Sequence, residues 1–241
     1  MTLDTGMEKK LTSAEISAMR RSYGDDGLET LPADPLVAFS QWLHEAHENP
    51  LIIEANAMVL TTADHEGNLS SRTVLLKDVS QHGFTFFSNY SSRKGLAIHS
   101  QPQVTLLFPW YAQERQVIIN GIAQQISRSE TEEYFATRPW NSQIGAWASR
   151  QSAPLESRTE LEERWKSAAE KWPEGSVVPT PPLWGGYRVM PTEIEFWQGR
   201  YSRLHDRLRY ERSRTYDHNV GYDEGNLDTS KEEWELKRYY P

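Results

Sequence analysis

Residues 57–77 read AMVLTTADHEGNLSSRTVLLK and have the pattern of a β-hairpin. A short apolar run, Ala57 to Thr62, leads into the turn-forming residues Asp64 to Asn68. A second run, Ser71 to Lys77, follows with β-branched and aliphatic residues between cations. Two such runs around a short polar turn predict a pair of antiparallel strands.

Strand-like runs of the same kind recur along the rest of the chain, at residues 83–89, 104–108, 116–127, 186–190, 193–198, 203–211 and 234–241. Gly121 interrupts the third of them and predicts a β-bulge. Many short strands with a few helices between them predict a mainly β fold of the α+β class, a β-barrel with helical additions.

Helix-capping signals mark where helices interrupt the strands. Asp34 can cap, and Pro35 can begin, a helix that runs through Leu43. Three further starts are predicted, at Ser91 or Ser92, at a capping box of Ser129 with Glu132 and at a second box of Ser157 with Glu160. Residues 141–149 form one more candidate helix.

The chain is predicted to hold one domain, residues 31–241, preceded by an N-terminal arm, residues 1–30. Within the domain, residues 213–231 are polar and contain glycine, which is typical of a surface loop. The 241 residues suffice for a sizeable core without disulfides or metal ions.

Composition excludes several classes of function. There is no cysteine, which excludes disulfides, thiolate catalysis and thiolate metal sites. A net charge of −8 argues against a nucleic-acid coat or an anionic membrane surface as partner. No apolar run approaches the roughly 18 residues of a membrane span, and no secretory signal is visible, so a cytoplasmic location is expected.

Familiar catalytic motifs are absent from the sequence. It contains no dinucleotide-binding glycine fingerprint, no Walker A loop and no nucleophile elbow. The histidines of the segment His44 to Glu48 are three residues apart, which suits a solvated helix face better than a metal site, and no metal is expected.

Four segments carry basic groups that a bound anion would explain. They are Arg72 to Lys77 on a strand, Arg93 and Lys94 at a helix N-terminus, Tyr134, Arg138 and Ser142 at a helix end, and Arg203, His205 and Arg207 on a predicted strand near Trp197. Side-chain alternation would place Arg72 and Lys77 on opposite faces, one toward a ligand and one toward a partner. The same rule would align Arg203, His205 and Arg207 on one face.

Each segment alone has a simpler explanation, as a solvated strand end, a misplaced helix start or an ordinary polar helix end. Together, in an acidic protein, they predict a pocket for one or two phosphorylated aromatic ligands.

The sequence resembles the pyridoxamine/pyridoxine 5′-phosphate oxidases, FMN-dependent enzymes that make pyridoxal 5′-phosphate. The resemblance rests on segments that occur in the same order and spacing, at residues 31–35, 72–77, 92–94, 106–110, 114–117, 142–147, 184–189, 194–199 and 203–207. It implies an FMN-binding split β-barrel, a Greek-key antiparallel barrel with flanking helices. It also implies a homodimer with FMN sites between the subunits and an N-terminal arm that is mobile.

The resemblance also assigns roles to residues of this chain. FMN contacts carry over to Arg72, Thr73, Val74, Leu75, Leu76, Lys77, Phe87, Ser88, Arg93, Lys94, Gln116, Gln151, Ser152, Trp197 and Arg207. Substrate contacts carry over to Lys77, Tyr134, Arg138, Ser142, Arg203, Leu204 and His205, with Arg20, Arg21 and Tyr23 from the arm. Arg203 and His205 are the expected catalytic pair, placed over the substrate ring.

One departure from the family pattern, Pro139 to Asn141, is expected to alter the rim of the phosphate pocket. The expected reaction is oxidation of pyridoxine or pyridoxamine 5′-phosphate, with oxygen as acceptor and hydrogen peroxide released. Two alternatives remain open from the sequence: a non-catalytic split-barrel protein that binds flavin or pyridoxal phosphate, and another flavin reductase. A nucleic-acid-binding module is a weak third, because no basic stripe is present.

Overall fold

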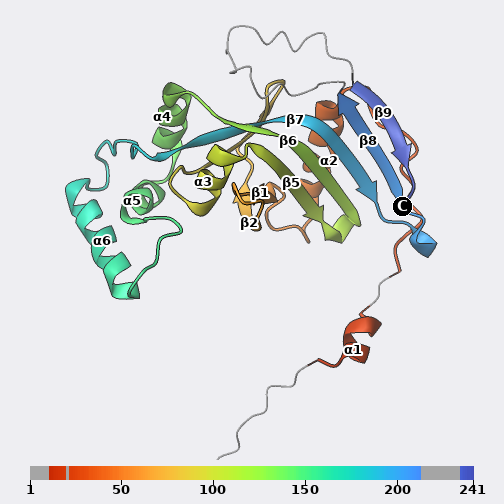
Figure 1. Ribbon diagram of the computed structural model, residues 1–241, viewed down its shortest axis with the longest axis horizontal. Helices are drawn as coiled ribbons and strands as arrows, with labels where there is room; N and C mark the ends of the chain where they lie inside the picture. The colour runs from red at the N-terminus through yellow and green to blue at the C-terminus, as the bar shows by residue number, and fades with distance from the viewer. Residues whose placement is uncertain (1–10, 20–21, 213–233) are drawn as a thin grey trace, which may run out of the picture.

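The fold is built around a long, curled antiparallel sheet (Figure 1). The computed structural model describes residues 11–19, 22–212 and 234–241. The helices are α1 (Ser13–Ala18), α2 (Pro35–Glu48), α3 (Arg93–Ser100), α4 (Arg128–Thr137), α5 (Trp140–Ala148) and α6 (Arg158–Lys171). The strands are β1 (Ala57–Ala63), β2 (Leu69–Leu75), β3 (Asp78–Ser80), β4 (Gly83–Asn89), β5 (Gln103–Trp110), β6 (Arg115–Gln125), β7 (Trp184–Gln198), β8 (Asp206–Arg212) and β9 (Trp234–Tyr239).

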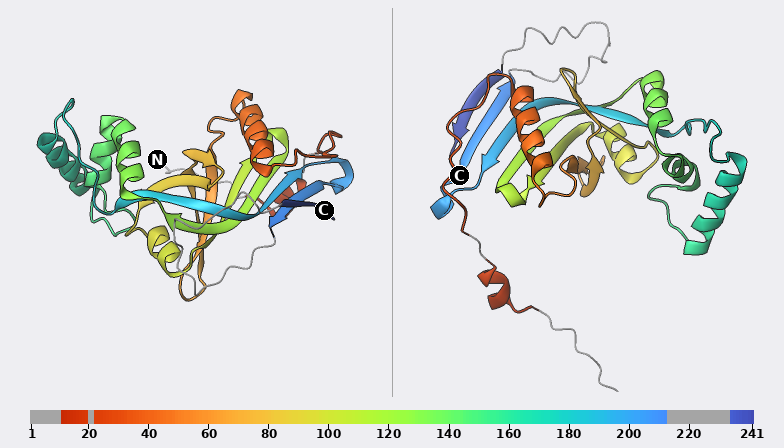
Figure 2. Two further views of the ribbon diagram at one scale, coloured as in Figure 1. Left: turned by 90° about the horizontal axis from the view of Figure 1, so that it is seen from above. Right: turned by 180° about the vertical axis from the view of Figure 1, so that it is seen from behind.

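The sheet has the order β2-β1-β5-β6-β7-β4-β3 in the part of the chain that the structure describes, and β8 and β9 extend it from β7. β7 connects its two halves, because its first residues pair with β4 and its last residues pair with β8. Figure 2 shows helices α4, α5 and α6 gathered at one end of the sheet and strands β8 and β9 at the other. The predicted antiparallel α+β barrel is confirmed.

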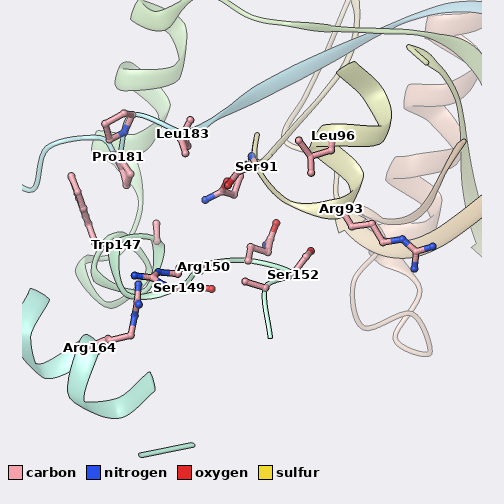
Figure 3. Close-up of a pocket in the computed structure, with 15 residues that line it drawn as sticks. Ser91, Arg93, Leu96, Trp147, Ser149, Arg150, Ser152, Arg164, Pro181 and Leu183 are labelled. Atoms are coloured by element: carbon pink, nitrogen blue, oxygen red, sulfur yellow. Dashed lines mark hydrogen bonds between the residues drawn. The ribbon is translucent and has the colours of Figure 1, made fainter. Parts of the chain in front are cut away.

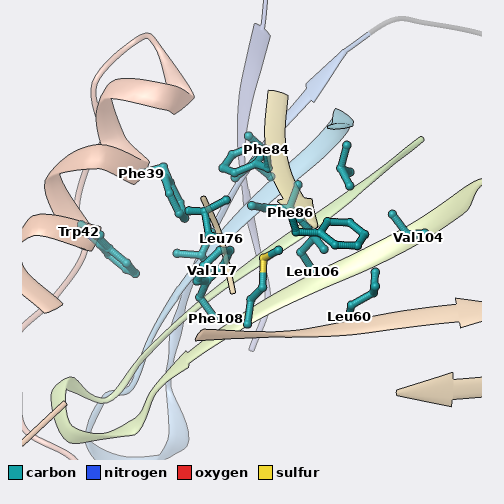
Figure 4. Close-up of a cluster of buried hydrophobic side chains, with 14 of the residues drawn as sticks. Phe39, Trp42, Leu60, Leu76, Phe84, Phe86, Val104, Leu106, Phe108 and Val117 are labelled. Carbon is teal, nitrogen blue, oxygen red and sulfur yellow. The ribbon is translucent and has the colours of Figure 1, made fainter. Parts of the chain in front are cut away.

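The main core lies between α2 and the sheet (Figure 4). Asp34 caps α2 by accepting a hydrogen bond from the backbone N–H of Leu36 at 2.8 Å, as predicted. Phe39 packs edge-on against the rings of Phe84 and Phe108, with ring centroids 5.0 Å apart in each pair. Each fully buried aromatic side chain of this kind contributes roughly 1.5–3 kcal/mol to folding.

A second core joins α5 and α6, and it corrects the expectation for Trp140. The Trp140 indole N–H donates to the carbonyl oxygen of Trp172, and its ring packs on Trp165 at 5.7 Å. Trp140 therefore fixes the helix pair and is absent from the lining of the phosphate pocket, where only its neighbour Pro139 lies.

Several local predictions hold. The hairpin of β1 with β2 forms, Ser92 caps α3, and Ser157 caps α6. The register of β6 with β7 shifts between Asn120 and Gly121, which is the predicted bulge. A Cβ at Gly121 would lie 2.3 Å from the carbonyl oxygen of Met190, so the close approach of the two strands needs glycine.

Other local predictions are wrong. The capping box of α4 is Ser127 with Glu130, because the helix begins at Arg128, before the predicted Ser129 and Glu132. The two strands predicted at 186–190 and 193–198 are one continuous strand, β7, which passes through the bulge region without a break. β3 is too short for its pattern to be recognised in the sequence. The predicted loop at 213–231 lies outside the described residues.

A stability prediction arises at two glycines in turns. Gly83 has φ +125°, and an added Cβ would lie 2.1 Å from the carbonyl oxygen of Val189, whereas Gly67 has φ +83° and open space around it. Gly83→Ala is expected to lower stability by at least ~3 kcal/mol, and Gly67→Ala by only ~1 kcal/mol. Thermal unfolding checks this, and similar melting temperatures for the two variants would contradict the role of crowding at Gly83.

The helices agree with the absence of a long apolar run from the sequence. Among those that the structure describes, none combines the length and the apolar character that crossing a membrane requires.

Candidate active site

A cationic pocket opens between β2, β4, α3 and α4, with a cavity of about 490 Å³. Four of its lining residues are cationic, Arg72, Lys77, Lys94 and Arg138, and none of the described residues that line it is acidic. The other lining residues are Thr73, Val74, Leu75, Phe87, Ser88, Tyr134, Thr137, Pro139, Ser142, Gln151 and Trp184. Cations gathered without a carboxylate repel one another, so the pocket is suited to an anion.

Arg72 and Lys77 both line this pocket, which corrects the prediction that they face opposite sides. The alternation rule fails because β2 ends at Leu75. Lys77 lies beyond the strand, with its backbone N–H donating to Thr85 on β4. Leu76, between them, is 5% exposed and belongs to the hydrophobic core, so its side chain does not reach the pocket.

Lys94 lies at the centre of a buried polar cluster at the start of α3. Its ammonium donates to the Gln151 side-chain oxygen at 2.8 Å and to the Ser88 hydroxyl at 3.1 Å. Burial, and then the positive charge of Arg72, lower the pKa of Lys94 to about 8. A cation at a helix N-terminus is unfavourable next to the helix dipole, so an anion in the pocket would stabilise it.

Arg72 is held in place by neighbouring strand groups. Its guanidinium donates to the carbonyl oxygen of Leu60 at 3.1 Å and to the Thr62 hydroxyl at 2.9 Å. Burial, followed by the charge of Arg93, lowers the pKa of Arg72. Arg72 therefore presents a fixed positive charge at the pocket.

An aromatic stack forms the wall of the pocket beside Arg138. Phe87 lies between Tyr134 and Trp184, with ring centroids 3.8 Å and 5.2 Å away and nearly parallel planes. The Arg138 guanidinium lies 4.7 Å above the Trp184 ring. Its Nη1 is buried and has no hydrogen-bond partner among the described residues, although buried polar groups are normally paired. This unused donor is suited to an anionic ligand.

Trp184 was not singled out in the sequence. It begins β7 and lies in the second core cluster, and a tryptophan usually packs a core. The pattern of the strand gives no sign that its ring also supports Arg138.

Arg93, Gln151 and Ser152 line a neighbouring cavity of about 790 Å³ (Figure 3). Gln151 lines both cavities and so links them. Ser152 has φ +72°, in the turn between α5 and α6. Sequence reasoning on charge alone could not have found Gln151 or Ser152, because neither carries a charge.

Arg203 and His205 lie far from the cationic pocket in the chain, in a loop after β7. The prediction of a strand over 203–211 is wrong at its start, because β8 begins at Asp206. Ser202 and Arg203 have φ of +56° and +62°, in the left-handed region. Two adjacent left-handed residues cost roughly 1 kcal/mol each and redirect the chain, so Arg203, His205 and Arg207 do not share a strand face.

His205 sits in an aromatic cluster with Trp197 and Tyr23. The His205 ring is 4.6 Å from the Trp197 ring and 5.5 Å from the Tyr23 ring. The backbone N–H of Arg200 donates to Nδ1 of His205 at 3.1 Å, which places the proton of the neutral ring on Nε2. Burial, and then Arg203, lower the pKa of His205, so the neutral form dominates at neutral pH.

These groups border a separate cavity of about 490 Å³, which is called the second cavity from here on. Its lining residues are Met19, Ser22, Tyr23, Arg200, Tyr201, Ser202, Arg203 and His205. Leu204 does not line it and is 68% exposed. Arg20 and Arg21 lie outside the described residues. The second cavity therefore gathers the predicted catalytic pair and one predicted residue of the arm.

Gln116, Trp197 and Arg207 form a row across three adjacent strands. Gln116 on β6 is directly opposite Trp197 on β7, and Trp197 is directly opposite Arg207 on β8. Directly opposite residues of antiparallel strands lie on the same face, so the three side chains share one face of the sheet. This row passes beside the second cavity, because its middle member, Trp197, contacts His205, which lines that cavity.

The predicted site is therefore divided into two halves within one chain. Trp184 at the start of β7 lines the cationic pocket, and Gln198 at its end leads into the Arg203 loop. A strand of 15 residues spans up to ~50 Å at ~3.3 Å per residue. Figure 1 shows helices α4 and α5 at one end of β7. Strands β8 and β9 lie at its other end. The two groups of predicted site residues therefore line separate cavities of the chain.

Comparison with known proteins supplies the family. The family model described as pyridoxamine 5′-phosphate oxidase matches residues 43–171. A second model, described as the pyridoxine 5′-phosphate oxidase C-terminal dimerisation region, matches residues 184–241, which hold the Arg203 half of the site.

Curated relatives agree over most of the chain. The pyridoxine/pyridoxamine 5′-phosphate oxidase of Streptomyces avermitilis is 48% identical over 199 residues, covering 80% of this chain and 89% of that protein. The enzyme of the same name from Rubrobacter xylanophilus is 51% identical over 200 residues, covering 82% and 91%.

Two solved structures are similar to the chain. PhzG from Burkholderia lata, in complex with tetrahydrophenazine-1-carboxylic acid, aligns with a TM-score of 0.74 and 27% identity, covering 90% of this chain and all of that one. A pyridoxamine 5′-phosphate oxidase-related, FMN-binding protein from Nostoc punctiforme aligns with a TM-score of 0.62 and 15% identity, covering 89% of this chain and all of that one, and supports the fold alone. The chain belongs to the pyridoxamine 5′-phosphate oxidase family.

Proposed function

We propose that this protein is an FMN-dependent oxidase that converts pyridoxine 5′-phosphate and pyridoxamine 5′-phosphate to pyridoxal 5′-phosphate. The observation that carries the proposal is the cationic pocket beside the aromatic stack. Four cations line it, none of its described lining residues is acidic, and Arg138 has a donor without a partner among the described residues. Those groups fit a phosphate monoester attached to an aromatic ring. The chain's membership of the oxidase family supports the reaction.

The residues fit FMN as well as the substrate. Bound FMN would accept a hydride from the substrate and pass the electrons to O2, which leaves as hydrogen peroxide. Arg72 supplies a fixed positive charge for the FMN phosphate, and Lys94 supplies a titratable one. Ser88 and Gln151 hold the Lys94 ammonium in position. The other proposed FMN contacts are Thr73, Val74, Leu75, Leu76, Lys77, Phe87, Arg93, Gln116, Ser152, Trp197 and Arg207. Of these, Leu76 would contribute through its backbone, because its side chain lies in the core.

Substrate binding is assigned to the other side of the pocket. We propose that Lys77, Tyr134, Arg138 and Ser142 hold the substrate phosphate, as charge-assisted donors. Arg138 is oriented for this by the Trp184 ring beneath it. Tyr134 offers its hydroxyl with the proton in place, because burial raises its phenol pKa above the ordinary value.

The second half of the site acts on the substrate ring. We propose that Arg203 and His205, with Leu204 beside them, lie over the ring and hold the reacting carbon in a near-attack position. His205 presents an Nε2–H donor, since Nδ1 is occupied by the Arg200 backbone N–H. Tyr23 packs edge-on against the His205 ring. We also propose that Arg20 and Arg21 of the N-terminal arm contact the substrate.

The active molecule is a homodimer, which the match to the family's dimerisation region supports. We propose that each site takes its cationic pocket from one subunit and its Arg203 half from the other, with FMN between them. A cytoplasmic location is part of the proposal, since a chain without cysteine has no need of an oxidising compartment.

The test is an oxygen-dependent turnover assay of the FMN-loaded protein with both phosphorylated substrates. Pyridoxal 5′-phosphate and hydrogen peroxide should appear in equal amounts, with ammonia as a further product of the amine. A protein that binds FMN and forms neither product would reject the oxidase and favour the flavin-carrier alternative.

The affinity for FMN is expected to fall as the pH rises through about 8, where Lys94 loses its proton. The phosphate of FMN is already dianionic above pH ~7, so it does not contribute to this change. The pKa of Lys94 in the folded protein is below the ordinary value of 10.5. Between about pH 8 and pH 10.5, therefore, Lys94 keeps its proton only in the unfolded chain. This group therefore makes the stability of the apo-protein rise with pH, opposite in sign to FMN affinity.

Fluorescence titration of apo-protein with FMN between pH ~7 and ~9 measures the effect. Lys94→Met is the matched control, since it should bind FMN weakly with no decline over this range. Equal pH dependence in the wild type and in Lys94→Met would contradict the assignment.

A further inference from the structure

Glu195 is a buried carboxylate on β7 that lies beside the Gln116, Trp197 and Arg207 row. It is 3% exposed, and it lies two residues before Trp197, so it faces the same side of the sheet. Its carboxylate accepts four hydrogen bonds, from two arginines of β8. A buried charge is normally kept only where it is paired in this way.

The contact with Arg207 is a two-point one. Nε of Arg207 donates to Oε1 of Glu195 at 2.9 Å, and Nη2 donates to Oε2 at 2.9 Å. The remaining nitrogen, Nη1, donates to the carbonyl oxygen of Tyr240 at 3.1 Å. All three nitrogens are thus anchored, and the plane of the guanidinium is fixed beside the Trp197 ring, with two N–H groups left over.

Arg209 depends on Glu195 much less. It also pairs with Glu193 at 3.3 Å and with Glu211 at 3.7 Å, and its guanidinium lies 4.2 Å above the Tyr239 ring. Arg207 has no acidic partner other than Glu195 among the residues that the structure describes. Loss of the Glu195 carboxylate would therefore release Arg207 and leave Arg209 held.

Burial by itself opposes ionisation of Glu195. The hydrogen bonds from Arg207 and Arg209, together with their positive charges, outweigh that effect and hold the pKa of Glu195 below its ordinary value. The carboxylate stays charged across the physiological range, so the two-point contact with Arg207 is permanent.

We propose that Glu195 is a positioning residue for the flavin site, which fixes the Arg207 guanidinium so that its free N–H groups meet FMN beside Trp197. The inference rests on the proposed function, in which Arg207 is an FMN contact. Glu195 itself does not touch the flavin. It acts through the orientation of Arg207, because an arginine on a flexible stem binds a planar partner poorly unless its fork is held.

The experiment is an FMN titration of apo-protein, followed by flavin fluorescence and by visible circular dichroism of the bound flavin. Glu195→Gln keeps the shape of the side chain but loses one of the two acceptor oxygens, and it is expected to weaken FMN binding about 10-fold or more. Glu193→Gln is the matched control. It makes the same charge change two residues away on the same strand face. Among the residues that the structure describes, the Glu193 carboxylate accepts hydrogen bonds from Asn120 and Arg209, so this variant should leave FMN affinity within about 2-fold.

A double-mutant cycle separates positioning from a general structural role. If Glu195 acts through Arg207, the Glu195→Gln change should have no further effect on FMN affinity in an Arg207→Gln background. In an Arg209→Gln background, it should still weaken binding. A loss of the same size in both backgrounds, or no loss in the wild-type background, would overturn the proposal.

A second variant covers the case in which Glu195→Gln does not fold. Arg207→Lys keeps the positive charge but cannot make the two-point contact, so it should weaken FMN binding and alter the circular dichroism of the flavin. Unchanged affinity in Arg207→Lys would overturn the proposal. All these measurements are made without turnover, so a wild type that binds FMN but makes no pyridoxal 5′-phosphate rejects the proposed function and not this inference.

Discussion

Mixed dimers of Arg138→Met and Arg203→Met are expected to recover activity that neither variant has alone. Each variant should retain less than ~1% of wild-type turnover, because each loses a charged partner of the substrate. The two defects lie in opposite halves of the divided site. In a dimer of one subunit of each kind, both defects fall in one site, and the other site receives two intact halves.

Random mixing gives about half mixed dimers, each with one of its two sites intact, so about one quarter of wild-type activity should return. Two affinity tags allow the mixed dimer to be isolated, and its activity should then be about half that of the wild type. Mixing Arg138→Met with Lys94→Met is the control. Both of these residues line the cationic pocket, so every site keeps one defect and no activity should return. Absence of recovery with Arg203→Met would place the whole site within one chain.

The fold was predictable where local signals agree with tertiary packing. Asp34 followed by Pro35 defines the start of α2, and Gly121 marks the bulge between β6 and β7. Such residues act through the backbone within a few positions, so their effect is visible in the sequence. The strand predicted to begin at Arg203 failed for the opposite reason. No glycine marks the left-handed turn at Ser202 and Arg203, and contacts from outside the segment must hold it.

The candidate site was predictable as a set of residues but not as an arrangement. Unpaired cations in an acidic chain identify Arg72, Lys94 and Arg138, since each lacks a sequence neighbour that would neutralise it. Whether two of them share a cavity depends on where a strand ends, and the Arg72 and Lys77 prediction failed for that reason. The proposed division of the site between subunits rests on the length of β7, which the pattern divides into two strands.

The burial and charge of Arg138 indicate a role in ligand binding. Its guanidinium is half-buried over the Trp184 ring, and burial lowers its pKa, since none of the carboxylates that the structure describes pairs with it. Keeping an unpaired donor and an uncompensated charge in a folded protein is unfavourable. An apolar side chain at this position is therefore expected to make the folded apo-protein more stable, and the proposed substrate phosphate would offset the difference.

The Arg138→Met variant is therefore expected to change activity and stability in opposite directions. Loss of a bidentate, charge-assisted contact of about 3–4 kcal/mol should lower kcat/KM for pyridoxine 5′-phosphate by ~100- to 1,000-fold. The melting temperature of the apo-protein should be unchanged or higher, because the buried charge is gone.

The same change should leave the much slower turnover of unphosphorylated pyridoxine nearly unaffected, since that substrate offers Arg138 nothing to bind. Discrimination between the two substrates is thus the quantity to measure, by initial rates on the FMN-loaded protein, with Arg158→Met on the exposed face of α6 as the control for loss of an arginine. An equal loss on both substrates, or a large fall in apo-protein stability, would show that Arg138 supports the fold of the pocket rather than the phosphate. Substrate discrimination and apo-protein stability together distinguish a binding role of Arg138 from a structural one. Only a residue retained for ligand binding lowers the stability of the apo-protein and is also required for turnover of the phosphorylated substrate.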